Sequence, residues 1–206
     1  MSEVDTVTEP VTRVRQRRWV TMALAFVLAG SLGAVASLTW YWLTLKDTTR
    51  VSDAAGVISV DLPDDWARQK RDDGWSPTVA GLTDGSQPAL EVSGDLASWR
   101  RPDSDAPGVF VGITRDLSAK LPPEETSTVD LGCAKITAQA GTFGSMPAIV
   151  HRRSDCPGPW TVTEAALTGD GFRVYVQIKQ PAEADRSAEI LGSLMITPDR
   201  LTTSAR

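Results

Sequence analysis

The side chains that could do chemistry are few, and they limit the functions to be expected. The chain of 206 residues has one histidine, His151, and two cysteines, Cys133 and Cys156. This set is too small for a zinc finger and rules out most multi-histidine metal sites, so we predict no metal and no cofactor. A Gly-x-Ser-x-Gly motif and a phosphate-binding loop with its lysine are both missing. We therefore predict that the protein is not an enzyme.

The two cysteines are predicted to form a disulfide across a hairpin. Gly144 and Ser145 suit a two-residue type II′ loop, which pairs residues whose numbers add up to 289. Cys133 and Cys156 satisfy this register and would face each other at a distance that suits a disulfide. The alternatives are metal ligands or a thiol nucleophile, and both lack partner residues. A disulfide also needs an oxidising compartment.

A second hairpin is predicted around Asp170 and Gly171, a pair typical of two-residue loops with positive φ at both positions. Paired residues then add up to 341, which sets Ala165 opposite Val176 on an apolar face. The other face carries Glu164 and is the more polar one. A slip by one residue would exchange the two faces, so the register is well specified.

A membrane span is the strongest signal in the chain. No charged residue occurs from Trp19 to Leu45, whereas Arg18 and Lys46 bracket this run. Trp19 and Trp40 are separated by 21 positions, or about 32 Å of helix at 1.5 Å per residue, and a bilayer core is about 30 Å thick. Tryptophan at both ends is typical of the two membrane interfaces. We predict a transmembrane helix over 19–45 that contacts membrane lipid.

The flanking charges predict the orientation of this helix. Positive side chains gather before it, which places residues 1–18 in the cytoplasm and residues 46–206 outside. Ala34-Val35-Ala36 also fits a signal-peptidase site, but the apolar run continues beyond it, so we favour an uncleaved signal-anchor in the cell membrane. The sequence leaves open whether cleavage after Ala36 ever occurs. The arginines that set the orientation are Arg13, Arg15, Arg17 and Arg18.

Small residues recur at every fourth position of the span. Such a stripe lets two helix backbones approach closely, which predicts a homodimer or a partner helix through the membrane. The alternative is a general richness in alanine and glycine from a GC-rich genome. The residues of this helix-packing stripe are Ala25, Ala29, Gly33 and Ser37.

The chain divides into one folded domain and its attachments. The cytoplasmic tail, 1–18, lacks an apolar period and is expected to be disordered. A linker over 46–55 follows the span, an extracytoplasmic α+β domain covers 56–198, and 199–206 form a C-terminal tail. Within the domain we predict strands over 57–62, 89–92, 109–113 and 194–196, a helical turn over 117–121, and a helix that begins at Pro181.

The domain resembles the PsbP-like fold. Its opening, Ile58-Ser59-Val60-Asp61-Leu62-Pro63-Asp64-Asp65-Trp66, and its close, from Val174 to Leu194, are similar to the first strand and to the last strand and helix of that family. With Val109-Phe110-Val111-Gly112 and the two cysteines, the chain resembles actinobacterial single-span membrane proteins that carry such a domain. The resemblance implies an antiparallel-sheet α-β-α sandwich without common catalytic residues, and hence a binding or accessory role.

The ligand is left open by the sequence. Trp99 and Trp160 are the residues we predict to contact a protein, glycan or lipid partner, and Trp99 is expected to be exposed beside two arginines. The negative net charge of −5 argues against nucleic acid. One alternative is an envelope hydrolase with a carboxylate pair. Another is a kinase-linked signalling protein with a phosphorylated tail.

Overall fold

The computed structural model describes residues 48–75, 87–122 and 132–201. The predicted cytoplasmic tail (1–18), the predicted transmembrane helix (19–45) with its small-residue stripe, and the cleavage motif lie outside these residues. No helix among the described residues is long and apolar enough to cross a membrane. Contacts divide the chain into one unit over 1–47 and another over 48–206, and the second unit is described below.

Two antiparallel sheets make up the second unit. The smaller sheet has the order β1-β2-β10 and the larger one the order β3-β4-β5-β9-β8-β7-β6. Hairpins join β6 to β7 and β8 to β9, whereas β5 pairs with the distant β9. The strands are β1 (Thr48–Ser52), β2 (Ile58–Pro63), β3 (Gln69–Arg71), β4 (Ala89–Ser93), β5 (Gly108–Thr114), β6 (Lys135–Phe143), β7 (Met146–Ser154), β8 (Trp160–Thr168), β9 (Arg173–Pro181) and β10 (Met195–Ile196); the helices are α2 (Ser187–Ser193) and α3 (Pro198–Leu201).

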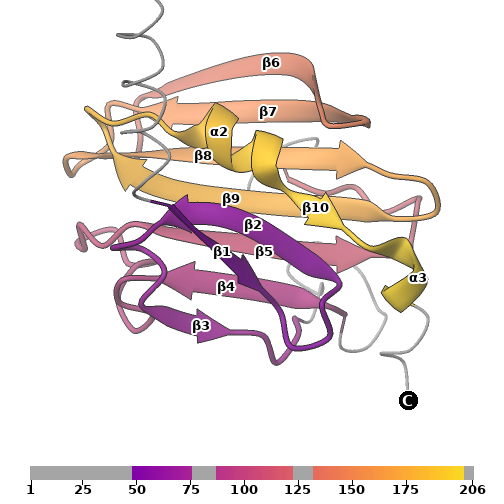
Figure 1. Cartoon of the computed structure of the whole chain (residues 1–206). Coiled ribbons are helices and arrows are strands. Elements are labelled where there is room, and N and C mark those ends of the chain that lie inside the picture. The colour runs from indigo at the N-terminus through magenta and orange to yellow at the C-terminus, as the bar shows by residue number, and fades with distance from the viewer. Residues whose placement is uncertain (1–47, 76–86, 123–131, 202–206) are drawn as a thin grey trace, which may run out of the picture. The chain divides into compact units, whose positions relative to one another are not determined.

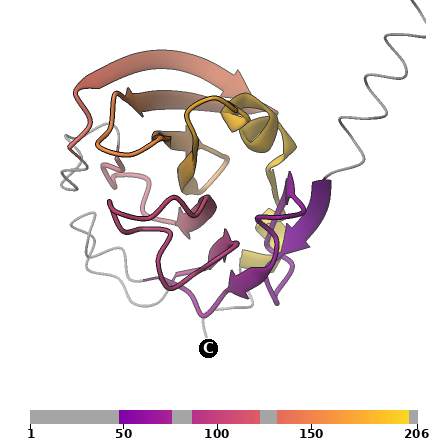
Figure 2. The same ribbon diagram turned by 90° about the vertical axis from the view of Figure 1, so that its left-hand side faces the viewer.

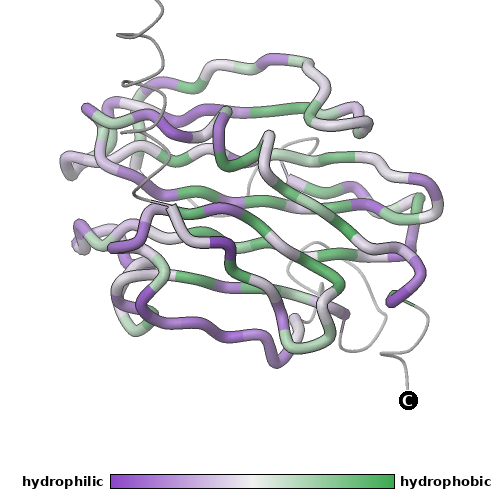
Figure 3. Tube along the Cα trace, viewed as in Figure 1, coloured by the Kyte–Doolittle hydropathy of each residue, from purple (hydrophilic) through white to green (hydrophobic). Residues whose placement is uncertain are grey.

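The main core lies between the large sheet and a layer formed by the small sheet and α2 (Figures 1 and 2). Alternate residues of the central strands point into it, and hydropathy is highest along these strands (Figure 3). Full burial of one such side chain stabilises the fold by about 1.5–3 kcal/mol. Representative members are Val60 and Leu62 of β2, Val174, Val176 and Ile178 of β9, and Ile190 and Leu191 of α2.

Both predicted hairpin registers are confirmed. In the first, β6 and β7 pair from Lys135 opposite Ser154 to Phe143 opposite Met146. Gly144 has a φ of 61°, as the first loop position of a type II′ turn requires. The predicted disulfide between Cys133 and Cys156 closes the open end of this hairpin.

In the second hairpin, β8 and β9 pair with Ala165 opposite Val176, as predicted. One detail of that prediction is wrong. Gly171 has a positive φ, but Asp170 does not. Among the described non-glycine residues, only Asp155 has a positive φ. One positive φ is sufficient to close this loop.

The α-β-α sandwich is confirmed only as an antiparallel, sheet-rich fold with few helices. The two helices in the described ranges both belong to the layer over the front of the large sheet (Figure 1). On the opposite face, the described residues form loops and no helix. Trp75 and Trp99 of these loops pack directly on β5, because Gly112 and Gly108 leave room there: a Cβ at either glycine would lie 2.6 Å from the indole.

The helix predicted from Pro181 begins later. Pro181 is the last residue of β9, at a strand end where the missing N–H costs nothing, and α2 starts at Ser187. The Oδ1 atom of Asp185 accepts a hydrogen bond from the Ser187 amide at 3.0 Å, which fixes this start. The turn predicted over 117–121 forms no helix, although Asp116 closes a turn by bonding Ser118.

Both predicted attachments of the domain are partly folded. Five residues of the expected linker (46–55) form β1, which an Arg50–Asp61 ion pair of 2.7 Å holds against β2. The expected C-terminal tail (199–206) begins inside α3, whose Leu201 is buried in the main core. The domain therefore extends at least from 48 to 201.

Candidate functional site

A groove opens where β6 and β7 extend beyond the cover of α2. We call it the inner groove. Its volume is about 300 Å³, at the lower end of the range for small-molecule sites. Four alternate residues of β6 form one wall, because successive side chains of a strand point to opposite faces. These are Thr137, Gln139, Gly141 and Phe143.

Apolar side chains line part of the inner groove. Val150 of β7 and Phe143 of β6 are partly buried against the main core, and Leu191 of α2 belongs to that core. Ala188, one turn earlier in α2, is exposed beside them. An apolar portion of a ligand could therefore rest on an extension of the core.

An ion pair forms the polar side of the groove. Arg152 of β7 contacts Asp185, and each side chain is 37% exposed. Gln180 Nε2 also donates to Asp185 Oδ1 at 2.7 Å. Burial alone would raise the pKa of Asp185, but hydrogen bonds from the Ser187 amide and from Gln180, with the charge of Arg152, lower it overall. The aspartate is therefore held ionised, and it compensates the arginine.

The hydroxyl groups in the groove are not arranged for nucleophilic attack. Thr163 Oγ1 and Ser187 Oγ lie 2.7 Å apart, and Gln180 Nε2 donates to Ser187 Oγ at 2.9 Å. The Asp185 carboxylate also accepts a hydrogen bond from the Ser187 side chain, but its lowered pKa makes it a weak base, and an activated nucleophile needs a stronger one. Within the described ranges, no three histidine, cysteine or carboxylate residues come together as metal ligands. The groove can bind through apolar contact and hydrogen bonds.

The structure places Trp99 differently from the sequence prediction. The prediction that Trp99 is exposed is wrong: its exposed fraction is 1%. Its indole Nε1 donates to Glu91 Oε1 at 2.8 Å, and the guanidinium of Arg100 lies 5.1 Å from its ring. Trp99 anchors the loop between β4 and β5.

Trp160 is also buried, with an exposed fraction of 2%. It packs against the disulfide of Cys133 and Cys156, and the ammonium of Lys179 lies 4.7 Å from its ring. Trp99 and Trp160 nevertheless line one hollow together, with Gln177 and Lys179; its volume of about 90 Å³ is below the range for small-molecule sites. A partner-binding role for Trp99 or Trp160 stays a prediction.

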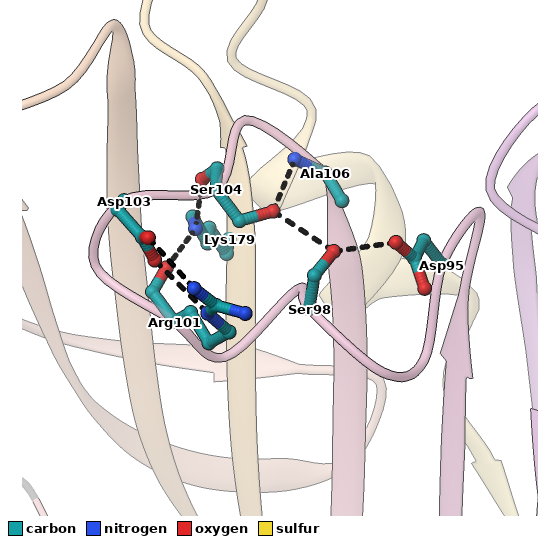
Figure 4. A network of polar contacts seen from close by, with 7 residues as sticks. All are labelled: Asp95, Ser98, Arg101, Asp103, Ser104, Ala106 and Lys179. Carbon is teal, nitrogen blue, oxygen red and sulfur yellow. Dashed lines mark hydrogen bonds and ion pairs between the residues drawn. The ribbon is translucent and has the colours of Figure 1, made fainter.

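Lys179 holds that loop on the sheet. Its Nζ donates to the carbonyl oxygen of Arg101 at 2.8 Å and to that of Ser104, as Figure 4 shows. Burial lowers the pKa of Lys179, while Asp105 and Asp103 act against this shift. Ser98 completes the network by donating to Asp95 Oδ2 at 2.6 Å. These contacts hold the loop between β4 and β5 against the sheet, and they keep Trp99 buried.

Carboxylates provide little support for the hydrolase alternative. Asp103 and Asp105 line one hollow beside Pro157, but Asp103 is 68% exposed and paired with Arg101. The hydrogen bond from Arg101 lowers the pKa of Asp103. A general acid near neutral pH needs a raised pKa, so Asp103 has the opposite of that property.

Comparison with known proteins gives the chain no family. No family model and no curated protein matches it. Among solved structures, a protein of Bacteroides thetaiotaomicron VPI-5482 is similar over 73% of this chain at 9% identity, with a TM-score of 0.42. This chain spans 49% of that protein.

A second similar structure is the cyanobacterial PsbP (CyanoP) of Synechocystis sp. PCC 6803. It has 15% identity and a TM-score of 0.40, over 73% of this chain and 93% of that one. These values indicate only a weak similarity of the backbone fold. The function is therefore argued from the residues of this chain.

The inner groove was missed by the sequence analysis. Thr137, Gln139 and Arg152 come from predicted hairpin strands, and their alternation already set them on one face. What the sequence could not show is that α2 starts at Ser187 and leaves this face uncovered. The late start of the helix is thus what creates the groove.

Proposed function

We propose that this protein is a non-catalytic binding module of the cell envelope, anchored by a transmembrane helix over 19–45. The observation that carries the binding role is the inner groove. It combines an apolar surface with hydrogen-bonding groups that are already paired with one another. The uncharged run between Arg18 and Lys46 supports the anchor, and the disulfide of Cys133 and Cys156 is consistent with an oxidising compartment.

The chemistry of the groove defines the ligand class. Phe143, Val150 and Leu191 favour an apolar group. Arg152 is compensated by Asp185, so a strongly charged ligand gains little. Gln139 offers both a donor and an acceptor at the open side. We infer an amphipathic ligand with an uncharged polar portion, presented by a protein, a glycan or a lipid.

Site-specific photocrosslinking in cells tests this proposal. In the full chain, a photoreactive benzoyl-phenylalanine replaces Ala188, which lines the groove, or the neighbouring Glu189, which does not. Both positions are exposed on α2, so they form a matched pair. We expect a light-dependent adduct from position 188 that is absent or several times weaker from position 189. Equal adducts from both positions, or none, would contradict the proposal.

A further inference from the structure

The large sheet has two edges, and the described residues protect only one of them. β3 forms one edge with three residues, of which Lys70 and Arg71 are charged. A short, charged edge strand resists pairing with another chain. β6 forms the other edge with nine residues. Its length alone makes it the more favourable template for a further strand.

Within the described ranges, β6 also lacks the other protections of an edge. Its pairing with β7 is continuous from Lys135 to Phe143, so no bulge twists it away. It contains no proline, and Lys135 at its start is its single charge. Most of its side chains are exposed, including the apolar Ile136 with an exposed fraction of 53%. An uncharged, exposed edge of this length is unusual unless something pairs with it.

We propose that β6 pairs antiparallel with β6 of a second copy of this chain, around a twofold axis at Gln139. Gln139 is the middle residue of the strand, so this register pairs all nine residues. Lys135 then lies opposite Phe143 of the partner subunit, and Ala138 opposite Ala140 of the partner subunit. No like charges meet, which satisfies the main requirement of a self-complementary pairing.

A second copy explains this edge better than a foreign peptide does. Residues 136–143 carry no charge, so the edge has nothing that selects a peptide of opposite charge. A self-pairing strand needs only to avoid repulsion, and β6 meets this condition. The proposed anchor would also confine copies of the chain to one membrane, which raises their effective concentration.

The pairing would complete the binding site, and this consequence rests on the proposed function of the groove. The twofold axis of two antiparallel strands is perpendicular to their sheet, so the inner faces of both copies lie on the same side. The two inner grooves then meet at the axis. Thr137 and Gln139 from both copies line a single trough between two α2 helices. Such a trough suits an extended amphipathic chain that reaches across both copies.

The oligomeric state of the full chain in nanodiscs or mild detergent tests the pairing. Gln139→Lys and Gln139→Glu each set two like charges at the axis. Since like charges directly opposite cost up to about 1 kcal/mol, we expect each variant to weaken the dimer about fivefold in sedimentation equilibrium. An equimolar mixture of the two variants should restore the wild-type affinity. Leu117→Lys, an exposed position off the β6 edge, is the matched control and should leave the dimer unchanged.

The remaining outcomes decide against the pairing. A monomeric wild-type chain would overturn it, as would a dimer that both Gln139 variants leave intact. A dimer that only Gly33→Leu disrupts would assign association to the transmembrane helix instead and would also overturn it. The crosslink from position 188 reports the groove independently: a groove adduct without a dimer removes only this inference, whereas a dimer without an adduct removes the proposed function.

Discussion

Arg153 Nε donates to Glu164 Oε2 at 2.7 Å on the face of the large sheet that lies away from the main core. Glu164 has no exposed surface, and Tyr175 donates to its other carboxylate oxygen at 2.9 Å. The sequence analysis placed Glu164 on the polar face of a hairpin. The loops anchored by Trp75 and Trp99 turn that face into a second, partly polar interior.

The pairing of Glu164 should dominate the stability of this interior. Glu164→Ala leaves the guanidinium of Arg153 without its buried partner, and loss of one member of a buried ion pair costs about 3–5 kcal/mol. Urea unfolding of the full chain, followed by circular dichroism, measures this cost. Glu189→Gln removes an exposed ion pair with Arg186 and should cost less than about 1 kcal/mol. Equal costs for the two variants would show that Glu164 is not buried.

Tyr175 should make stability fall at alkaline pH. Burial, and then the negative charge of Glu164, raise the pKa of Tyr175 well above its ordinary value near 10. The unfolded chain therefore loses the phenolic proton at a lower pH than the folded chain does. The stabilisation is complete below about pH 10 and is lost as pH rises toward the folded-state pKa.

The comparison that isolates this effect uses Tyr175→Phe. The variant should be less stable than the wild type at pH 8, because it loses the hydrogen bond to Glu164. The difference should shrink as pH rises above about 10. Denaturant titrations between about pH 8 and 11 measure it, and a constant difference would mean that Tyr175 titrates alike in both states.

Gly108 should not tolerate a side chain. A Cβ at this position would lie 2.6 Å from the indole of Trp99, so Gly108→Ala must displace the ring or the strand. Overpacking of this kind costs about 1–3 kcal/mol, and tryptophan fluorescence during unfolding would report it. Gly192→Ala is the control, since nothing lies within 4 Å of a Cβ there. If both variants unfold alike, Trp99 does not pack on β5.

The disulfide should stabilise the hairpin that carries the groove. The sequence separation of Cys133 and Cys156 is 23 residues, for which loop-closure entropy predicts about 3 kcal/mol. The Cys133→Ser/Cys156→Ser double variant should therefore unfold at a lower urea concentration. Its tryptophan emission should also shift to the red, because the two cysteines pack against the cluster of Trp160 and Val162. An unchanged midpoint would show that the bridge does not constrain the unfolded chain.

Local patterns predicted the two hairpins of the domain well. Gly144-Ser145 and Asp170-Gly171 fixed both registers and the pairing of Cys133 with Cys156, because turn residues and strand alternation act over short distances. The same local reasoning failed at Pro181 and at Trp99. The continuation of β9 past the expected helix start depends on its pairing with β8. The burial of Trp99 depends on Gly108, in a strand that follows the loop. The inner groove arises from such long-range relations, so no local pattern could reveal it.

The most direct test of the binding role is to fill the groove. Gly141 lies on its inner wall, where a Cβ would make only ordinary contact with Phe143 at 3.6 Å. Gly141→Trp should therefore occupy the groove without disturbing the strand, whereas Ala140→Trp places the same ring on the opposite face of β6. Measured by the crosslink from position 188 in cells, the Gly141 variant should lose the adduct and the Ala140 variant should keep it. An adduct that survives in both would show that the ligand does not bind in the inner groove.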